Sequence, residues 1–159
     1  MTRAYVALGA NLGKPRQQLL EALDAIDRLP GVRLVRRSRF YRTVPWGVVN
    51  QPLFINAVAE LDITLEPHAL LDALQALETA AGRVRTLRYG PRTLDLDLLH
   101  IDGVTLDDTR LTLPHPRMHE RAFVLLPLAD LAPDFVLADG VSVAARLTAL
   151  DLAGCESVA

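Results

Sequence analysis

Apolar and polar residues alternate in several short segments of the chain, as they do in strands with one buried face. Residues 4–8 form a brief apolar run, and residues 33–43 have a mixed strand-like pattern. In residues 53–61 every second side chain is apolar, while Phe54 and Asn56 fall together on the other face. An aromatic ring beside a carboxamide can stack on a flat heterocycle and pair with its edge, although a packed Phe and a turn-bonded Asn explain the pattern equally well.

The strand predicted over residues 93–99 has an acidic face. Its leucines alternate with Asp95 and Asp97, so both carboxylates project from the face opposite the leucines. Such oxygens suit Mg²⁺, which keeps several waters and bridges to substrate phosphates. A solvated face is the commoner interpretation, but strands disfavour Asp and neighbouring carboxylates repel, which a bound cation would offset. A turn at residues 102–103 and a second strand over residues 104–106 are predicted to follow.

Helical periodicity marks four segments. Residues 15–29 and residues 66–81 repeat apolar side chains at helical spacing, and each segment has a proline at or near its first position. Residues 124–131 are apolar and predict a further helix, and residues 143–152 predict an amphipathic one. The order strand, helix, strand, strand, helix, strand predicts an α+β fold, with two helices on one face of an antiparallel sheet and the acidic strand facing the other side.

Composition limits the classes of protein to which the chain can belong. At 159 residues, half of them apolar, it can bury one core, and a single domain over residues 1–159 is expected. A net charge of −2 argues against a protein that coats nucleic acid. The apolar runs are too short for a membrane span and no signal peptide is visible, so a cytoplasmic location is expected. Cys155 is the only cysteine, and the four histidines lack the spacing of a zinc site.

A cluster of arginines precedes the acidic strand. Four of them lie close together in a segment interrupted by a Gly-Pro pair: Arg83, Arg85, Arg88 and Arg92. Planar guanidinium groups match phosphate oxygens bidentately, so a basic segment beside two carboxylates suits a polyphosphate substrate. Taken alone, the cluster is more often a set of solvated surface arginines, and only its position beside the two carboxylates favours the phosphate interpretation.

Three other features invite a functional interpretation. The glycine loop of residues 9–13 is similar to a phosphate-binding P-loop, but it has three residues between its glycines instead of four, and a tight turn is the expected role. His115 lies between two prolines that fix its backbone, so it could donate to a phosphate or be an ordinary surface residue. Gln75 and Glu78 share a polar helix face that solvation would explain.

Two motifs give the chain a family resemblance. The run from Gly90 to Asp97 (Gly-Pro-Arg-Thr-Leu-Asp-Leu-Asp), followed by Pro114 and His115, closely resembles the 6-hydroxymethyl-7,8-dihydropterin pyrophosphokinases of folate biosynthesis. The resemblance implies a ferredoxin-like sheet with helices packed on one face and C-terminal helical additions. It also implies transfer of pyrophosphate from ATP to the hydroxymethyl group of 6-hydroxymethyl-7,8-dihydropterin, with release of AMP.

The resemblance also implies roles for individual residues. Asp95 and Asp97 are expected to hold two Mg²⁺ ions between the triphosphate and the pterin hydroxyl, and Arg83 and Arg92 are expected to act with them during transfer. The residues expected to bind the pterin are Thr43, Pro45, Trp46, Phe54, Asn56, Asp95 and Phe123. Those expected to bind ATP are Gln75, Glu78, Arg85, Tyr89, Arg92, Leu98, Arg110, Thr112, His115 and Arg121.

The expected partners are the two small-molecule substrates, without nucleic acid or membrane, and the chain is expected to be a monomer. Two other classes of protein remain as alternatives. An RNA-binding module on the same fold would stack bases on the aromatics of its sheet, although the acidic pI of about 6.1 argues against it. A regulatory domain that binds a small molecule would need no metal.

Overall fold

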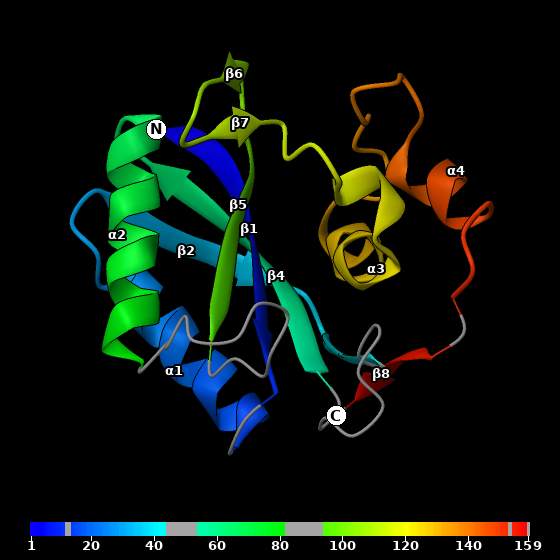
Figure 1. The fold of residues 1–159 in the computed structure, drawn as a ribbon, viewed down its shortest axis with the longest axis horizontal. Coiled ribbons are helices and arrows are strands. Elements are labelled where there is room, and N and C mark those ends of the chain that lie inside the picture. The colour runs from blue at the N-terminus through cyan, green and yellow to red at the C-terminus, as the bar shows by residue number, and fades with distance from the viewer. Residues whose placement is uncertain (12–13, 44–53, 82–93, 153, 159) are drawn as a thin grey trace.

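The computed structural model spans the chain and describes all residues except 12–13, 44–53, 82–93, 153 and 159. Six of the strands in this described part form one antiparallel sheet in the order β5-β1-β4-β3-β8, with β2 paired to the later half of β4 (Figure 1). They are β1 (Thr2–Ala10), β2 (Val32–Arg37), β3 (Phe40–Thr43), β4 (Phe54–Ile63), β5 (Asp95–Ile101) and β8 (Cys155–Val158). The predicted α+β class with an antiparallel sheet is confirmed.

Helices cover both faces of this sheet. Helices α1 (Pro15–Asp27) and α2 (Pro67–Ala80) lie on one face, as predicted, and α3 (Ala122–Leu131) and α4 (Val143–Leu147) lie on the other (Figure 1). A short 3-10 helix, η1 (Met118–Glu120), precedes α3. The second face is therefore only partly open, because the C-terminal helices cover much of it.

Two apolar clusters sandwich the sheet. Even-numbered residues of β1 pack with α1 and α2, whereas Tyr5 packs with Val58, Leu99 and α3 on the other side. Each fully buried Leu or Ile side chain contributes about 1.5–3 kcal/mol by leaving water. The alternation of β1 and β4 thus supplies side chains to both clusters and fixes which face each of their residues occupies.

An irregularity in β5 changes its alternation beyond the two aspartates. The pairing with β1 shifts between Tyr5 and Val6, opposite Leu98 and His100, so Leu99 is an extra residue in β5. Leu98 belongs to the cluster beside α1 and α2 and Leu99 to the one beside α3, while His100 stacks with Tyr5 at 6.2 Å between ring centroids. This bulge lets two consecutive residues face α3 without disturbing the alternation that precedes them.

The strand predicted over residues 33–43 is in fact two strands. At the break, the N–H of Val58 donates to Ser38 Oγ instead of to a backbone carbonyl (2.9 Å). Directly after Ser38, the backbone N–H of Arg39 donates to Asp130 Oδ2 in α3 (3.0 Å). Side-chain oxygens thus accept from two backbone N–H groups at the break, while the N–H of Ser38 still donates to the carbonyl of Val58 (2.9 Å). On either side of it, β2 and β3 pair with different halves of β4.

Two further expectations were wrong in detail. The turn at residues 102–103 exists, but the strand after it, β6 (Leu106–Asp107), pairs with β7 (Thr112–Leu113) and not with β5. The helix expected over residues 143–152 ends at Leu147, and the chain then forms β8 beside β3. The described helices include none that is long and apolar enough to cross a membrane.

Candidate active site

A row of residues crosses four neighbouring strands on the face that α3 partly covers. Gly9 of β1 is paired with Asp95 of β5 on one side and with Asn56 of β4 on the other, and Asn56 is paired in turn with Tyr41 of β3. Directly paired residues share a face, and strands lie about 4.8 Å apart, so Asp95 and Asn56 stand about 10 Å apart across Gly9. We call Asp95, Gly9, Asn56 and Tyr41 the cross-strand row.

Glycine in this row makes room for the amide beside it. A Cβ atom at Gly9 would lie 3.3 Å from Asn56 Oδ1, which is closer than an ordinary van der Waals contact. Asn56 is 5% exposed, so its carboxamide lies almost within the protein. No local sequence pattern connects the two residues, because their proximity depends on the register of β1 against β4.

The two aspartates project from the same face, as predicted. Asp97 pairs with Ala7, two residues along the strand from the pair of Asp95 with Gly9. Both are partly exposed, whereas Leu94, Leu96 and Leu98 are buried on the opposite face. The interpretation of residues 93–99 as an amphipathic strand with one acidic face is therefore confirmed.

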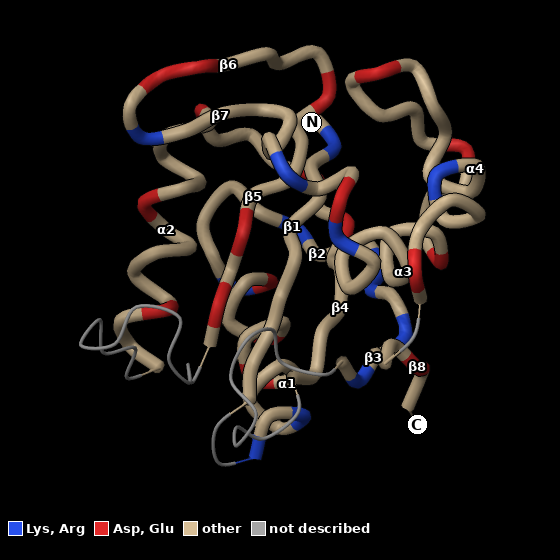
Figure 2. Tube along the Cα trace, turned by 45° about the vertical axis from the view of Figure 1, so that its right-hand side comes forward, with Lys and Arg blue, Asp and Glu red and all other residues tan. Residues whose placement is uncertain are grey.

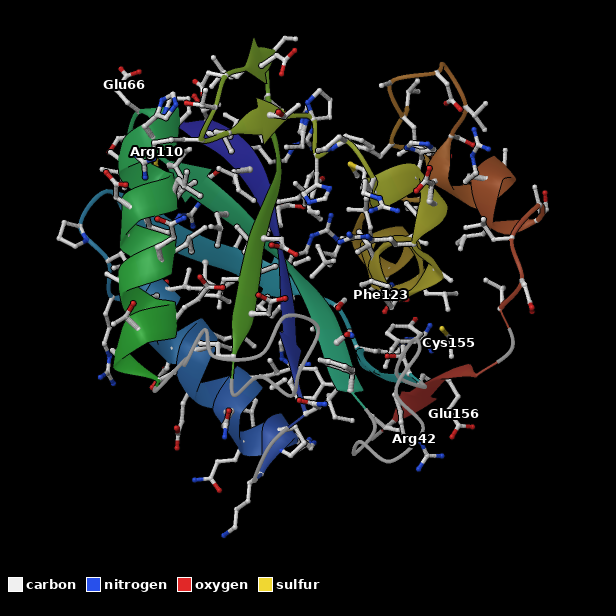
Figure 3. The ribbon with its side chains drawn as sticks, viewed as in Figure 1. Arg42, Glu66, Arg110, Phe123, Cys155 and Glu156 are labelled. Carbon is white, nitrogen blue, oxygen red and sulfur yellow. The ribbon has the colours of Figure 1, made fainter. Side chains whose placement is uncertain are left out.

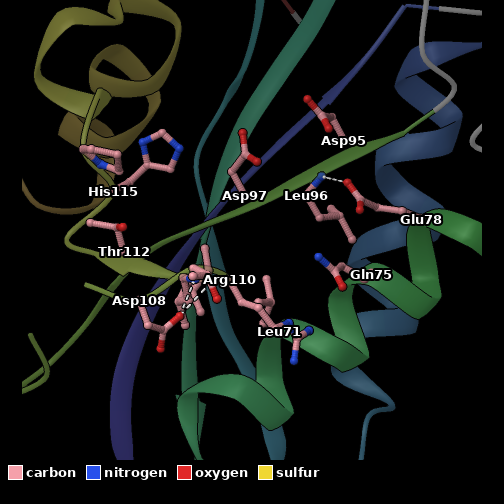
Figure 4. Close-up of a pocket in the computed structure, with 14 residues that line it drawn as sticks. Leu71, Gln75, Glu78, Asp95, Leu96, Asp97, Asp108, Arg110, Thr112 and His115 are labelled. Atoms are coloured by element: carbon pink, nitrogen blue, oxygen red, sulfur yellow. Dashed lines mark hydrogen bonds between the residues drawn. The ribbon is translucent and has the colours of Figure 1, made fainter. Parts of the chain in front are cut away.

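A pocket of about 380 Å³ opens beside the aspartates, between α2, β5 and the β6–β7 hairpin (Figure 4). Acidic positions run along both α2 and β5, the two elements that flank it (Figure 2). The pocket brings together eight residues that the family resemblance assigns to metal or ATP: Gln75, Glu78, Asp95, Asp97, Leu98, Arg110, Thr112 and His115.

Glu78 differs most from its expected environment. It is only 3% exposed, so solvation does not explain it. Its Oε2 accepts a hydrogen bond of 2.8 Å from the N–H of Leu96, the residue between the two aspartates (Figure 4). This bond joins α2 to the backbone of β5 between the two aspartates, and charge-assisted bonds of this kind are among the stronger ones.

His115 is held as a neutral ring by its surroundings. The backbone N–H of His115 donates to the carbonyl of Leu99 (2.8 Å). The ring Nδ1 of His115 accepts from the backbone N–H of Arg117 (3.2 Å). Burial lowers the pKa of His115 to about 4, and the cations Arg121 and Arg117 add to this effect. At neutral pH the proton therefore sits on Nε2, which can donate to a bound anion.

The β6–β7 hairpin is fastened to α2 at the mouth of the pocket. Arg110 forms an ion pair with Asp72 (2.5 Å), and His68 contacts Asp108 (2.7 Å). Hydrogen bonds from the N–H groups of Arg110 and Leu111 hold the pKa of Asp108 below its usual range. Asp108 was not a predicted site residue, although an Asp that caps its own turn is a common pattern.

The described residues that are expected to bind the pterin lie on the same side of the sheet. Thr43 of β3 pairs with Phe54 of β4, next to the pair of Tyr41 with Asn56. Phe123 projects from the first turn of α3, toward the end of the sheet where β3 and β8 lie (Figure 3). Arg121, just before this helix, places its guanidinium 5.7 Å from the centre of the Phe123 ring. Their predicted roles agree with this shared side of the sheet.

Six of the predicted site residues lie outside the described residues: Pro45, Trp46, Arg83, Arg85, Tyr89 and Arg92. Among the described residues, no group of three or more His, Cys, Asp or Glu side chains could hold a metal ion. Asp95 and Asp97 alone nevertheless fit Mg²⁺, which is commonly bound through one or two carboxylates, with waters and substrate phosphates completing its six ligands.

Comparison with known proteins identifies the family. The model of the 7,8-dihydro-6-hydroxymethylpterin-pyrophosphokinase (HPPK) family matches residues 5–133. A 2-amino-4-hydroxy-6-hydroxymethyldihydropteridine pyrophosphokinase of Pseudomonas aeruginosa is 55% identical over 154 residues, which cover 97% of this chain and 95% of that protein. A protein of the same name from Methylorubrum extorquens is 47% identical over 99% of both chains.

Solved structures agree in fold. A Plasmodium falciparum HPPK-DHPS crystallised with pteroate superposes with a TM-score of 0.74 at 13% identity, over 93% of this chain and 42% of that one. At this identity the superposition supports the architecture alone. The sequence matches go further, and they show that the chain belongs to the HPPK family, the ATP-using pyrophosphokinases of folate biosynthesis.

Proposed function

We propose that this chain transfers pyrophosphate from ATP to the hydroxymethyl group of 6-hydroxymethyl-7,8-dihydropterin and releases AMP. In this reaction the hydroxymethyl oxygen bonds to the β-phosphorus, and the bond from that phosphorus to the oxygen that leaves with AMP breaks. The observation that supports this reaction best is that Asp95 belongs both to the pocket and to the cross-strand row. This residue lines the pocket beside α2 and also stands in the cross-strand row with Asn56.

Because Asp95 belongs to both, the two substrates can lie on opposite sides of it. We infer that ATP occupies the pocket between α2, β5 and the β6–β7 hairpin, where the neutral His115 donates from Nε2 and Arg110 attracts phosphates. Arg121 does not line this pocket, but its charge acts on His115, and we propose that it attracts the phosphates from the side of α3. The pterin then lies against the cross-strand row, between Phe54 and Phe123, with its polar edge on Asn56. The acceptor hydroxyl and the triphosphate would meet at Asp95, and such alignment is a large part of catalysis of phosphoryl transfer.

Asp95 and Asp97 would hold two Mg²⁺ ions, which would neutralise charge on the triphosphate while its pyrophosphoryl group is transferred. The protein contributes a rigid pair of carboxylates, because Leu96 between them is buried and Glu78 accepts a hydrogen bond from its backbone N–H. Arg83 and Arg92 are proposed to act during transfer. The remaining proposed contacts are Arg85 and Tyr89 to ATP, and Thr43, Pro45 and Trp46 to the pterin.

We also propose that the chain acts as a monomeric single domain, in the cytoplasm. A size-exclusion measurement with light scattering tests the oligomeric state, and a mass near 17.4 kDa would agree with a monomer.

AMP release with ATP, Mg²⁺ and the hydroxymethyl dihydropterin tests the reaction. We expect release to require all three, and Asp97→Asn to lower it at least about a hundredfold because one metal carboxylate is lost. The matched control is Asp62→Asn, which removes an ion pair with Arg33 at the far end of β4 (2.6 Å) and should leave the rate unchanged. Release of AMP without pterin, or a normal rate in Asp97→Asn, would reject the proposal.

A further inference from the structure

An ionic cluster at the edge of the core, with Asp130 mostly buried and Arg39 exposed, fastens the end of α3 to β3, outside the pocket. The carboxylate of Asp130 in α3, 16% exposed, accepts from the hydroxyl of Tyr41 with both oxygens (2.9 and 3.0 Å). Arg39 donates to it from Nη2 (2.9 Å), from Nε (3.2 Å) and from its backbone N–H (3.0 Å). We call Arg39, Tyr41 and Asp130 the α3 anchor.

The anchor stays in a single charge state at neutral pH. Burial favours protonation of Asp130, but the hydrogen bonds from Arg39 and Tyr41 outweigh it and lower the pKa of this carboxyl. Burial, followed by the bond to Asp130, raises the pKa of Tyr41. A carboxylate near the C-terminal end of a helix is unfavourable beside the helix dipole, so these partners are needed to keep Asp130 in place.

A second arginine holds the same end of α3. Arg36 donates from Nη2 to the carbonyl of Leu131 (2.7 Å) and pairs with Glu60 of β4 (3.1 Å). The two arginines come from opposite sides of the break between β2 and β3. The last turn of α3 is thus fixed to the sheet in two directions.

The other end of α3 carries Phe123. A helix of ten residues is about 15 Å long. Pro127 removes one hydrogen bond inside α3, the bond to the carbonyl of Phe123, but the helix continues through it, so the position of its last turn influences where its first turn lies. Tyr41 is also the cross-strand partner of Asn56. The anchor therefore connects the helix that bears Phe123 to the strand next to the one that bears Asn56.

We propose that the α3 anchor is a positioning device that sets the spacing between Phe123 and the cross-strand row, and thereby the affinity for the pterin. The inference rests on the proposed function, because it takes Phe123 and Asn56 as pterin contacts. The pocket assigned to ATP is lined from α2, β5 and the β6–β7 hairpin, and none of the described residues that line it belongs to the anchor. Arg121, the N-cap of α3, is the one described residue assigned to ATP that lies next to Phe123, so we expect the anchor to act more strongly on the pterin than on ATP.

Equilibrium binding of each substrate to Tyr41→Phe and Asp130→Asn tests the proposal. Tyr41→Phe removes only the hydroxyl and keeps the packed ring, so it should fold even if Asp130→Asn does not. We expect the pterin Kd to rise about tenfold in each variant, the ATP Kd to stay within about twofold, and kcat at saturating pterin to be nearly unchanged. In the double variant the effects should not add, because both break the same contact.

Two further variants distinguish an error in the positioning role from an error in the proposed pterin site. Asp62→Asn, which breaks the ion pair with Arg33, is the control for loss of a surface carboxylate and should bind pterin normally. Phe123→Ala tests the slot itself. If Phe123→Ala weakens pterin binding but neither anchor variant does, or if the anchor variants weaken ATP binding equally, the positioning role is wrong. If Phe123→Ala also binds pterin normally, the proposed pterin site is wrong as well.

Discussion

Replacing Glu78 by alanine tests whether α2 holds the acidic strand in place. The substitution removes the acceptor of a 2.8 Å hydrogen bond from Leu96, and Leu96 is only 4% exposed, so water cannot easily replace it. A lost hydrogen bond to a charged group costs about 1.5–3 kcal/mol. Removing a buried carboxylate also relieves its desolvation, which favours the lower part of this range. We therefore expect Glu78→Ala to lower the free energy of unfolding by about 2 kcal/mol, a value in the lower part of this range.

Urea unfolding followed by circular dichroism measures this change directly. A loss of about 2 kcal/mol corresponds to a Tm about 4–8 °C lower in a chain of this size. Glu78→Gln keeps an acceptor oxygen and should lose about half as much. Gln75→Ala is the matched control, since Gln75 lies one turn earlier on the same helix and is partly exposed; it should change stability by no more than about 0.5 kcal/mol. If Glu78→Ala is as stable as this control, the bond to Leu96 does not hold β5.

Three further predictions follow from the geometry of the site. Gly9→Ala should raise the pterin KM about three- to tenfold with little change in kcat, because its Cβ would press on Asn56 Oδ1; a steady-state titration of pterin checks this, and an unchanged KM would contradict it. Removal of Mg²⁺ with EDTA should stop AMP release and leave the Tm within about 1 °C, since buried leucines hold the strand without metal; a large loss of Tm would show that the metal is structural. The wild type should lose stability as the pH falls from 6.5 toward 4, because His115 takes up a proton in the unfolded chain but not in the folded one, where its pKa is about 4. The urea midpoint should depend less on pH in His115→Gln than in the wild type, and an equal pH dependence of the two midpoints would contradict the low pKa.

Strong local periodicity made the central elements predictable. The helix at residues 66–81 and the acidic strand at residues 93–99 each repeat one residue class at a fixed spacing, and the structure has both as α2 and β5. The break at Ser38 was not predictable in this way, since it depends on Asp130, which is far away in the chain. The strand β8 was missed because Glu156 and Ser157 give it no apolar face, and it forms only by pairing with β3.

The candidate site shows the same contrast between residues that a local pattern reveals and residues whose role depends on contacts distant in the chain. The period of two was enough to find Asp95 and Asp97, because both lie on one strand. The contribution of Gly9 depends on the register of β1 against β4, which no local pattern encodes. Glu78 was placed on a solvated face because Gln75 shares it, and only the approach of β5 to α2 reveals that its carboxylate is buried.

The position of β1 between β4 and β5, with side chains in both apolar clusters, has a consequence for local opening. Amide protons of β1 should exchange with deuterium only when the whole domain unfolds, because no smaller opening frees a strand bonded on both sides. Gly9 is part of that strand, so the middle of the cross-strand row belongs to the slowest-exchanging part of the protein. Any adjustment to an incoming substrate must then come from the segments that surround the row, while the central strand serves as a fixed reference.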